Sequence, residues 1–162
     1  DAQHEVTVCP GEKHILFALG KTTLVCRLID GEYLNYNAAI PPTFEHTVPV
    51  NTREFITCLE RVSLLVSEKL KNPVRIAFDG AVMKMTCITA VGKSYDECAI
   101  DGSIDGLEIG FNSRYLLDAL RACNDETVHL SLKGALYPIG ITPLEGEKYT
   151  YLVLPVRLKA DA

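Results

Sequence analysis

The sequence has 162 residues, a net charge of −5 and 48% hydrophobic residues. This hydrophobic content supplies enough apolar side chains for a core, which excludes an intrinsically disordered chain. The acidic balance argues against a simple basic nucleic-acid-binding domain, although a few basic groups could still gather on one surface. The sequence contains no recognisable signal peptide and no apolar run of roughly 18 residues, the length of a membrane span.

The cysteines and histidines point away from metal and disulfide chemistry. The six cysteines include no C-x-x-C pair, and the four histidines have no zinc-ligand spacing. A chain with its own core rarely depends on a disulfide framework. We therefore expect reduced, mostly buried thiols in a cytoplasmic protein without a cofactor.

The first 43 residues contain strand patterns but no helix. Three short strands are predicted there, at residues 5–9, 14–19 and 22–28. Residues 31–42 follow as a linker that ends in two prolines. Because the chain starts at Asp1 without an initiator methionine, we expect residues 1–43 to end a domain that begins upstream. A trimmed piece of a longer chain and a natural proteolytic fragment fit this start equally well.

An internal repeat organises the rest of the chain. Residues 50–59 read VNTREFITCL, and residues 111–120 read FNSRYLLDAL. In both copies the apolar residues follow the spacing of one face of an α-helix. Asn51 and Asn112 are candidate N-caps of the two helices, and Glu54 can complete a capping box in the first.

The similarity between the copies resumes where residues 74–88 align with residues 128–142. Apolar and polar residues alternate around Gly80 in the first segment and around Gly134 in the second, which predicts two β-hairpins. Each copy also has an opening strand before its helix and a third strand after its hairpin. The opening strands are predicted at residues 45–50 and 107–111, and the third strands at 93–100 and 149–159.

The sequence thus predicts an α+β domain at residues 44–162, built from a duplicated β-α-β-β-β unit. Each helix has one apolar face, which must cover a sheet. We expect both helices to lie side by side on one face of a combined antiparallel sheet.

Several segments resemble the DNA polymerase III beta subunit family, the bacterial sliding clamps. Residues 27–33 (RLIDGEY) look like the family's strand that leaves its second domain. Residues 67–69 (SEK) look like the segment after the first helix of the third domain, and residues 109–112 (IGFN) like the start of the second helix. The run YLVLPVRL at residues 151–158 is the most specific match. The resemblance covers essentially the whole chain.

That resemblance implies the DNA-clamp fold, with residues 1–43 as the end of the second clamp domain and residues 44–162 as the third. In the family, two three-domain subunits close head to tail into a ring around duplex DNA. The ring is a processivity factor of DNA replication and catalyses no reaction. Without the family's first domain, we expect this chain to be monomeric or weakly associated, in the bacterial cytoplasm at the nucleoid.

The resemblance also implies a hydrophobic cleft where DNA polymerase, clamp-loader and repair proteins insert a short linear motif. Carried over to this chain, the cleft consists of Leu34, Ala39, Asn112, Tyr115, Leu136, Leu152, Val153, Leu154, Pro155, Val156 and Arg157. The family usually has a proline, a basic residue and a larger aliphatic where this chain has Leu34, Ala38 and Ala39. In the family, the rest of that pocket lies in sequence upstream of this chain. Peptide affinity should therefore be weaker than for the intact protein, and motif preference could differ.

The residues of this cleft also fit other structural roles. Pro155 interrupts an alternating apolar run, which predicts a strand end or a sheet edge. By its pattern alone, the same run fits an ordinary buried terminal strand. Tyr115 suits the rim of a pocket, or plain packing beside the helix start.

Two further surfaces follow from the resemblance. The basic residues that would face DNA phosphates are Arg61, Lys69, Lys71, Arg114 and Arg121. The residues that would contact a second subunit are Leu64, Leu65, Asp96 and Glu97. The basic residues also fit a solvated charged face, and the two leucines also fit core packing.

Other classes of function have less support in the sequence. Phosphate-binding loops, nucleophile–base motifs and metal-ligand spacings are absent from it, so we do not expect an enzyme. A small-molecule-binding or general protein-interaction α+β domain is the alternative, because helices packed on a sheet can enclose a pocket. No glycine-rich or charged constellation marks such a pocket.

Overall fold

The computed structural model describes residues 5–66 and 72–158. The chain divides into two compact units, Asp1–Tyr36 and Asn37–Ala162. The short helix α1 (Tyr36–Ala39) spans this division. No helix in the described ranges is long and apolar enough to cross a membrane.

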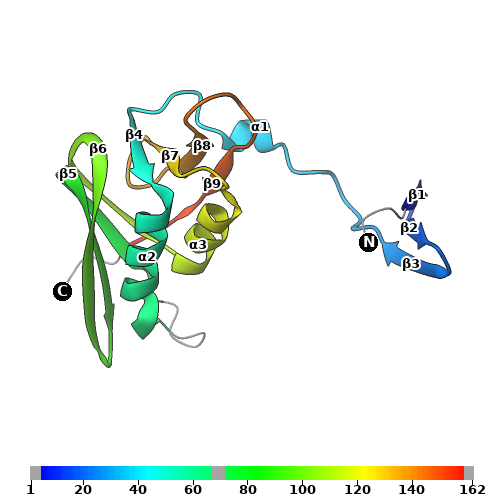
Figure 1. The fold of residues 1–162 in the computed structure, drawn as a ribbon, viewed down its shortest axis with the longest axis horizontal. Coiled ribbons are helices and arrows are strands. Elements are labelled where there is room, and N and C mark those ends of the chain that lie inside the picture. The colour runs from blue at the N-terminus through cyan, green and yellow to red at the C-terminus, as the bar shows by residue number, and fades with distance from the viewer. Residues whose placement is uncertain (1–4, 67–71, 159–162) are drawn as a thin grey trace. The chain divides into compact units, whose positions relative to one another are not determined.

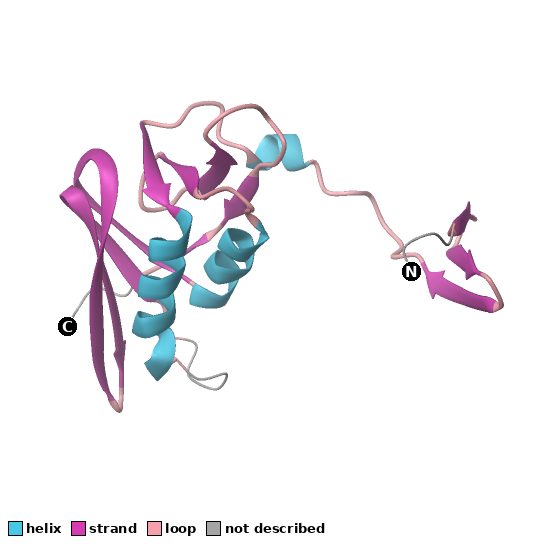
Figure 2. Cartoon of the chain, viewed as in Figure 1, coloured by secondary structure: helices cyan, strands magenta, loops and turns pink. Residues whose placement is uncertain are grey.

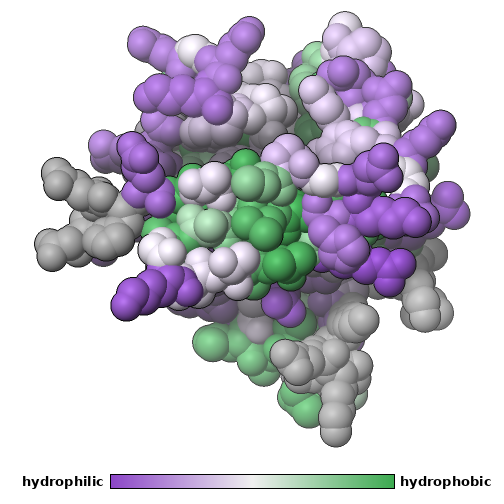
Figure 3. Space-filling view, turned by 90° about the vertical axis from the view of Figure 1, so that its right-hand side faces the viewer, coloured by the Kyte–Doolittle hydropathy of each residue, from purple (hydrophilic) through white to green (hydrophobic). Residues whose placement is uncertain are grey.

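The first unit is a three-stranded antiparallel sheet in the order β1-β2-β3. Its strands are β1 (Thr7–Pro10), β2 (His14–Leu19) and β3 (Thr22–Arg27). All three lie within two residues of their predicted bounds. Val8, Leu24 and Val25 are exposed, so these strands have no buried core of their own. In the space-filling view, apolar side chains gather at the centre of the visible face with polar side chains around them (Figure 3).

Two helices of the second unit begin where the sequence predicts them. They are α2 (Thr52–Val62), which continues into the 3₁₀ helix η1 (Ser63–Leu65), and α3 (Ser113–Ala122). Asn51 Oδ1 accepts a hydrogen bond from the Glu54 N–H at 2.9 Å, and Asn112 Oδ1 accepts one from the Arg114 N–H at 3.1 Å. Both N-caps are therefore confirmed, and each satisfies a backbone donor that the first helical turn leaves unpaired.

The strands of the second unit form two antiparallel sheets rather than the single combined sheet that we predicted. One sheet has the order β4-β7-β8-β9, from β4 (His46–Asn51), β7 (Thr127–Leu132), β8 (Ile139–Pro143) and β9 (Tyr151–Val153). The other has the order β10-β6-β5, from β5 (Val74–Thr89), β6 (Gly92–Phe111) and β10 (Pro155–Val156). Helices α2 and α3 lie side by side, as expected (Figures 1 and 2). The α+β class is confirmed.

The predicted hairpin turn at Gly80 is wrong, because β5 is one continuous strand of 16 residues. Gly80 has a φ of 60° and lies where the register shifts against β6, so it belongs to a β-bulge. Its N–H donates to Asp105 Oδ1 at 2.8 Å. The predicted strands at residues 93–100 and 107–111 are likewise parts of the 20-residue strand β6. Because β5 and β6 are both long, the two segments of β6 stay paired with β5 on either side of the bulge. The chain turns after Thr89 instead of at Gly80.

The hairpin predicted in the second copy is confirmed. Strands β7 and β8 pair with Leu130 opposite Ile141, and residues 133–138 connect them. The third strand of this copy divides in two, because β9 pairs with β8 whereas β10 pairs with β6. Pro155 stands at the start of β10, an edge strand, where its missing N–H removes no central ladder bond.

The core lies between the helices and the sheets. Phe55 and Leu59 of α2 and Leu116 and Leu120 of α3 are fully buried, together with Met83 and other residues of the strands. Burial of a large apolar side chain contributes roughly 1.5–3 kcal/mol to folding, so this layer holds the helices in place. The start of α3 is thereby fixed beside the C-terminal strands, with which α3 makes contact at β9.

Candidate functional site

A groove runs along the start of α3 and the last two strands, with a volume of about 690 Å³. We call it the C-terminal groove. Its lining residues are Asn112, Tyr115, Asp118, Ala119, Thr150, Tyr151, Leu152, Val153, Leu154, Pro155 and Val156. The fold thus brings together seven of the eleven residues that the sequence assigned to a peptide cleft.

The C-terminal groove combines a buried floor with an exposed apolar rim. Val153 is buried, whereas Tyr115 and Leu154 are 62% and 69% exposed. Leu154 stands between β9 and β10, where the chain passes from one sheet to the other. Covering such apolar surface contributes about 25 cal/mol per Å², so the rim is suited to bind an apolar side chain. One side of the β10 backbone also has no strand partner within the described residues.

Four predicted cleft residues do not line this groove. Leu136 is exposed in the loop between β7 and β8, and Arg157 is exposed directly after β10. Ala39 ends α1, and Leu34 belongs to the first unit.

Four lining residues were missed from the sequence. Asp118 and Ala119 follow Tyr115 by three and four positions, which places them on the same face of α3, so helical spacing could have found them. Thr150 and Tyr151 lie in the predicted strand at residues 149–159, and Tyr151 begins the C-terminal run, but neither was assigned to the cleft.

Hydrogen bonds join the segment before β9 to the connection between α3 and β7, and join that connection to the start of α2. The Tyr149 hydroxyl donates to Asp125 Oδ2 at 2.5 Å, and the Tyr149 ring stacks on Tyr151 with centroids 5.0 Å apart. The Thr52 hydroxyl donates to the Asp125 carbonyl at 2.8 Å. Burial and then the hydrogen bond to Asp125 raise the pKa of Tyr149 well above its usual value, so the phenol remains a donor. These bonds support one end of the C-terminal groove.

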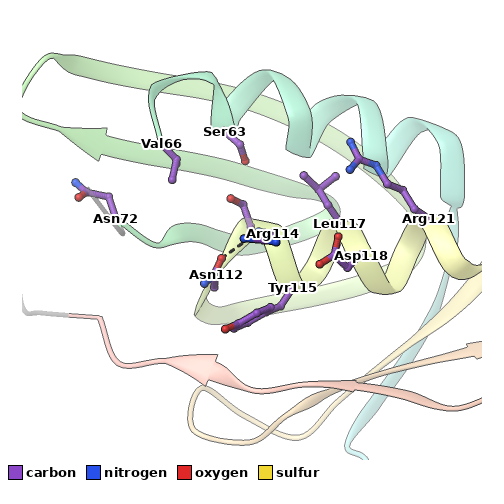
Figure 4. Close-up of a pocket in the computed structure, with 10 residues that line it drawn as sticks. Ser63, Val66, Asn72, Asn112, Arg114, Tyr115, Leu117, Asp118 and Arg121 are labelled. Atoms are coloured by element: carbon purple, nitrogen blue, oxygen red, sulfur yellow. Dashed lines mark hydrogen bonds between the residues drawn. The ribbon is translucent and has the colours of Figure 1, made fainter. Parts of the chain in front are cut away.

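A second groove, whose lining residues Figure 4 draws, lies between α3 and residues that follow the end of α2, and has a volume of about 670 Å³. We call it the α2–α3 groove. Its lining residues are Ser63, Val66, Asn72, Asn112, Ser113, Arg114, Tyr115, Leu117, Asp118 and Arg121. Asn112, Tyr115 and Asp118 line both grooves, so the two meet at the first turns of α3.

The predicted DNA-facing arginines differ in their local partners. Arg61 Nε lies 2.5 Å from Asp96 Oδ2, and its guanidinium holds the pKa of that carboxyl below its usual value. Arg121 Nη2 lies 2.7 Å from Glu60 Oε1 and links the two helices. Arg114 is exposed and makes no ion pair with any residue that the structure describes. Lys69 and Lys71 lie outside the described residues.

The predicted interface residues lie near the turn between β5 and β6. Leu64 is 82% exposed, which excludes core packing for this leucine. Leu65 is half-buried against Gly92. Ile88 and Val91, which lie at the β5–β6 turn, are exposed as well.

Both acidic interface candidates have local partners. Asp96 pairs with Arg61, and Glu97 accepts a hydrogen bond from the Tyr95 hydroxyl. An exposed pair of this kind contributes little to stability, about 0–1 kcal/mol, and leaves both groups within reach of a partner.

None of the six cysteines, all of which the structure describes, forms a disulfide. Three thiols are buried, including Cys58 and Cys98, but Cys9 is exposed, contrary to part of our expectation. Arg61 Nη2 donates to Cys58 Sγ at 3.3 Å. Within the two described ranges, no three His, Cys, Asp or Glu side chains group closely enough to hold a metal ion.

Alkaline pH is expected to destabilise the protein through Cys98. Burial raises the pKa of the Cys98 thiol from 9.0 to about 12. The neutral thiol therefore stabilises the fold fully below pH 9, and this contribution is lost as the pH rises from 9 to 12. We expect the free energy of unfolding to fall by on the order of 2 kcal/mol over this range. Urea unfolding of Cys98→Ala should show a weaker pH dependence, whereas Cys9→Ala should retain that of the wild type.

The chain is similar to known proteins over most of its length. Residues 37–157 match the model of the DNA polymerase III beta subunit, C-terminal domain. The beta sliding clamp of Synechocystis is 33% identical over 156 residues, which are 94% of this chain and 40% of that protein. This chain thus spans about 40% of the length of that relative.

Solved structures agree with this match. The DNA polymerase sliding clamp of Bacillus subtilis is 29% identical with a TM-score of 0.84, over 98% of this chain and 43% of that one. The DNA polymerase III beta subunit of Thermotoga maritima is 26% identical with a TM-score of 0.79, over 95% and 42% of the two chains. The fold is therefore that of the sliding clamps. The chain belongs to the DNA polymerase III beta subunit family, and the part that matches is the C-terminal domain.

Proposed function

We propose that this chain is part of a processivity factor of DNA replication, a clamp that tethers partner proteins to DNA and catalyses no reaction. In this proposal residues 1–43 end the second clamp domain and residues 44–162 form the third. The C-terminal groove is the observation that carries the proposal, because it joins Tyr115 of α3 to Leu154 and Pro155 of the C-terminal run. Family membership supports the same assignment.

The proposed role of the C-terminal groove is to bind a linear motif of DNA polymerase and clamp-loader subunits. Apolar side chains of the motif would cover Tyr115 and Leu154, and the unpaired side of β10 would offer backbone hydrogen bonds. Ala39, Leu136 and Arg157, which belong to the same unit as the groove, are proposed to extend the site.

Duplex DNA is the second proposed partner, bound without sequence preference when the full ring encircles it. Arg61, Arg114 and Arg121 are the described candidates for phosphate contacts, along with Lys69 and Lys71. Because Arg61 and Arg121 are already paired with carboxylates, we expect this arc to bind DNA weakly by itself. Encirclement rather than affinity would keep the clamp on DNA, in the bacterial cytoplasm at the nucleoid.

The surface near the β5–β6 turn is proposed to contact the second subunit of a head-to-tail dimer. Leu64 supports this role, since a leucine so exposed gains free energy when a partner covers it. Leu65, Asp96 and Glu97 lie in the same region and complete the proposed interface.

Peptide binding tests the proposed function directly. A labelled peptide with a polymerase-type clamp motif, Gln followed by Leu and Phe, is expected to bind this chain saturably. The triple variant Leu154→Ala, Pro155→Gly, Val156→Ala should bind at least about tenfold more weakly, because it removes the apolar wall of the groove. Fluorescence anisotropy measures both affinities.

Leu64→Ala is the matched control, since it truncates an exposed leucine outside the C-terminal groove. This control should bind the peptide as the wild type does, and circular dichroism should show that all variants are folded. Equal affinity of the triple variant and the wild type would place the peptide elsewhere and overturn the proposal.

A further inference from the structure

The two grooves lie next to each other on α3. Asn112, Tyr115 and Asp118 line both of them. In Figure 4, Tyr115 extends from α3 toward the C-terminal strand, whereas Ser63 lies on the α2 side. A residue that flanks a peptide in the C-terminal groove is therefore close to the α2–α3 groove.

The α2–α3 groove offers hydrogen-bond donors that the protein itself does not use. The Ser63 hydroxyl oxygen is buried and has no hydrogen-bond partner among the described residues. Arg114 lines the groove and makes no ion pair within the described part of the chain. Leaving a buried polar group unsatisfied is unfavourable, so a ligand that accepts from Ser63 removes this penalty.

The charges around Arg114 favour an anion over a cation. Arg121 also lines the groove, but Glu60 already pairs with it. Asp118 lies one turn after Arg114 and also lines the groove, so the lining has one carboxylate against two arginines. A guanidinium binds a carboxylate through two parallel hydrogen bonds. Leu117 and Val66 add apolar contact for the methylene groups of a glutamate.

We infer that the α2–α3 groove is a second subsite for the partner peptide, which takes an acidic residue flanking the motif. Arg114 pairs with the carboxylate, and the Ser63 hydroxyl donates to it. This inference rests on the proposed function of the C-terminal groove. Peptide is favoured over DNA as the occupant because the groove is a hollow that adjoins the proposed peptide site. A duplex, by contrast, presents its phosphates along a broad surface.

A double-mutant cycle between peptide and protein tests this subsite. The motif peptide is prepared with glutamate or glutamine flanking the motif, at either end, and titrated into wild type and Arg114→Gln. When the flanking residue is at one of the two ends of the motif, the glutamate peptide should bind wild type about threefold to tenfold more tightly than the glutamine peptide. This preference should disappear in Arg114→Gln and should shrink at high salt.

Arg53→Gln is the matched control, because Arg53 is the counterpart of Arg114 in the repeat and lines neither groove. It should retain the preference for glutamate. Ser63→Ala should reduce the preference for glutamate, but by a smaller factor than Arg114→Gln does.

Other results separate this inference from the proposed function. If both peptides bind wild type equally and lose affinity in the triple variant of the C-terminal groove, the second subsite is overturned and the proposed function stands. If neither peptide binds, both are overturned. If Arg114→Gln weakens only the binding of duplex DNA at low salt, the arginine serves DNA, and the acidic subsite is overturned.

Discussion

Replacing Phe55 by alanine is expected to lower the free energy of unfolding by about 3–5 kcal/mol. Phe55 is fully buried on the apolar face of α2, in the core shared with Leu59 and the strands. The substitution removes the ring and leaves a cavity that close-packed neighbours fill only in part. Since a domain of this size has roughly 5–15 kcal/mol of net stability, the loss would consume a large fraction of it.

Urea unfolding followed by helical circular dichroism measures this effect. The signal reports residues 37–162, because α2 and α3 lie there. Tyr115→Ala is the control, since it also truncates an aromatic side chain but at an exposed position. Its unfolding free energy should change by less than about 1 kcal/mol. A comparably small change for Phe55→Ala would mean that α2 does not pack on the core as described.

Alanine at Gly110 is expected to displace β10 and weaken peptide binding while the core remains folded. A Cβ at this position would lie 2.5 Å from Leu158 Cδ2 and 2.7 Å from the Val156 carbonyl oxygen. The backbone oxygen cannot move away without breaking the pairing of Val156 with Gly110 and of Pro155 with Phe111. Because β10 is a two-residue edge strand, it would yield before β6 does.

The measurement is a titration of the motif peptide, together with amide hydrogen exchange at Val156. Binding should weaken by at least about tenfold, and exchange should accelerate. Gly106→Ala is the control, because nothing lies within 4 Å of its Cβ position but its φ of 70° penalises alanine. This variant should lose about 1 kcal/mol of stability and keep its peptide affinity. Wild-type affinity in Gly110→Ala would show that β10 is not a wall of the binding site.

Features that depend on neighbours in sequence were predicted well. Asn51 and Asn112 were expected as N-caps, and both accept the hydrogen bond that a cap requires. The apolar spacing that starts at Phe55 and Leu116 defines the buried faces of α2 and α3. A cap and a helix face involve residues within a few positions of one another, so their pattern is visible in one short segment.

Features that depend on strand pairing were predicted less well. Gly80 was expected to turn the chain, yet it lies in a bulge within β5. Glycine with positive φ occurs in both turns and bulges, so the choice depends on the partner strand. That partner, β6, is a single strand whose full length keeps β5 extended. The separation into two sheets depends likewise on β9 and β10 choosing different partners.

The sequence by itself determined the repeat, the two capped helices, the resemblance to the clamps and the C-terminal run that lines the groove. Only the tertiary structure decided which charges are neutralised and where the grooves lie. Arg61 pairs with Asp96, and Arg121 with Glu60, across 35 and 61 positions of sequence. The α2–α3 groove joins Ser63 to Arg114 across a comparable separation. Contacts of this kind arise when packed helices and strands bring distant residues together, and a periodic pattern within one segment carries no information about them.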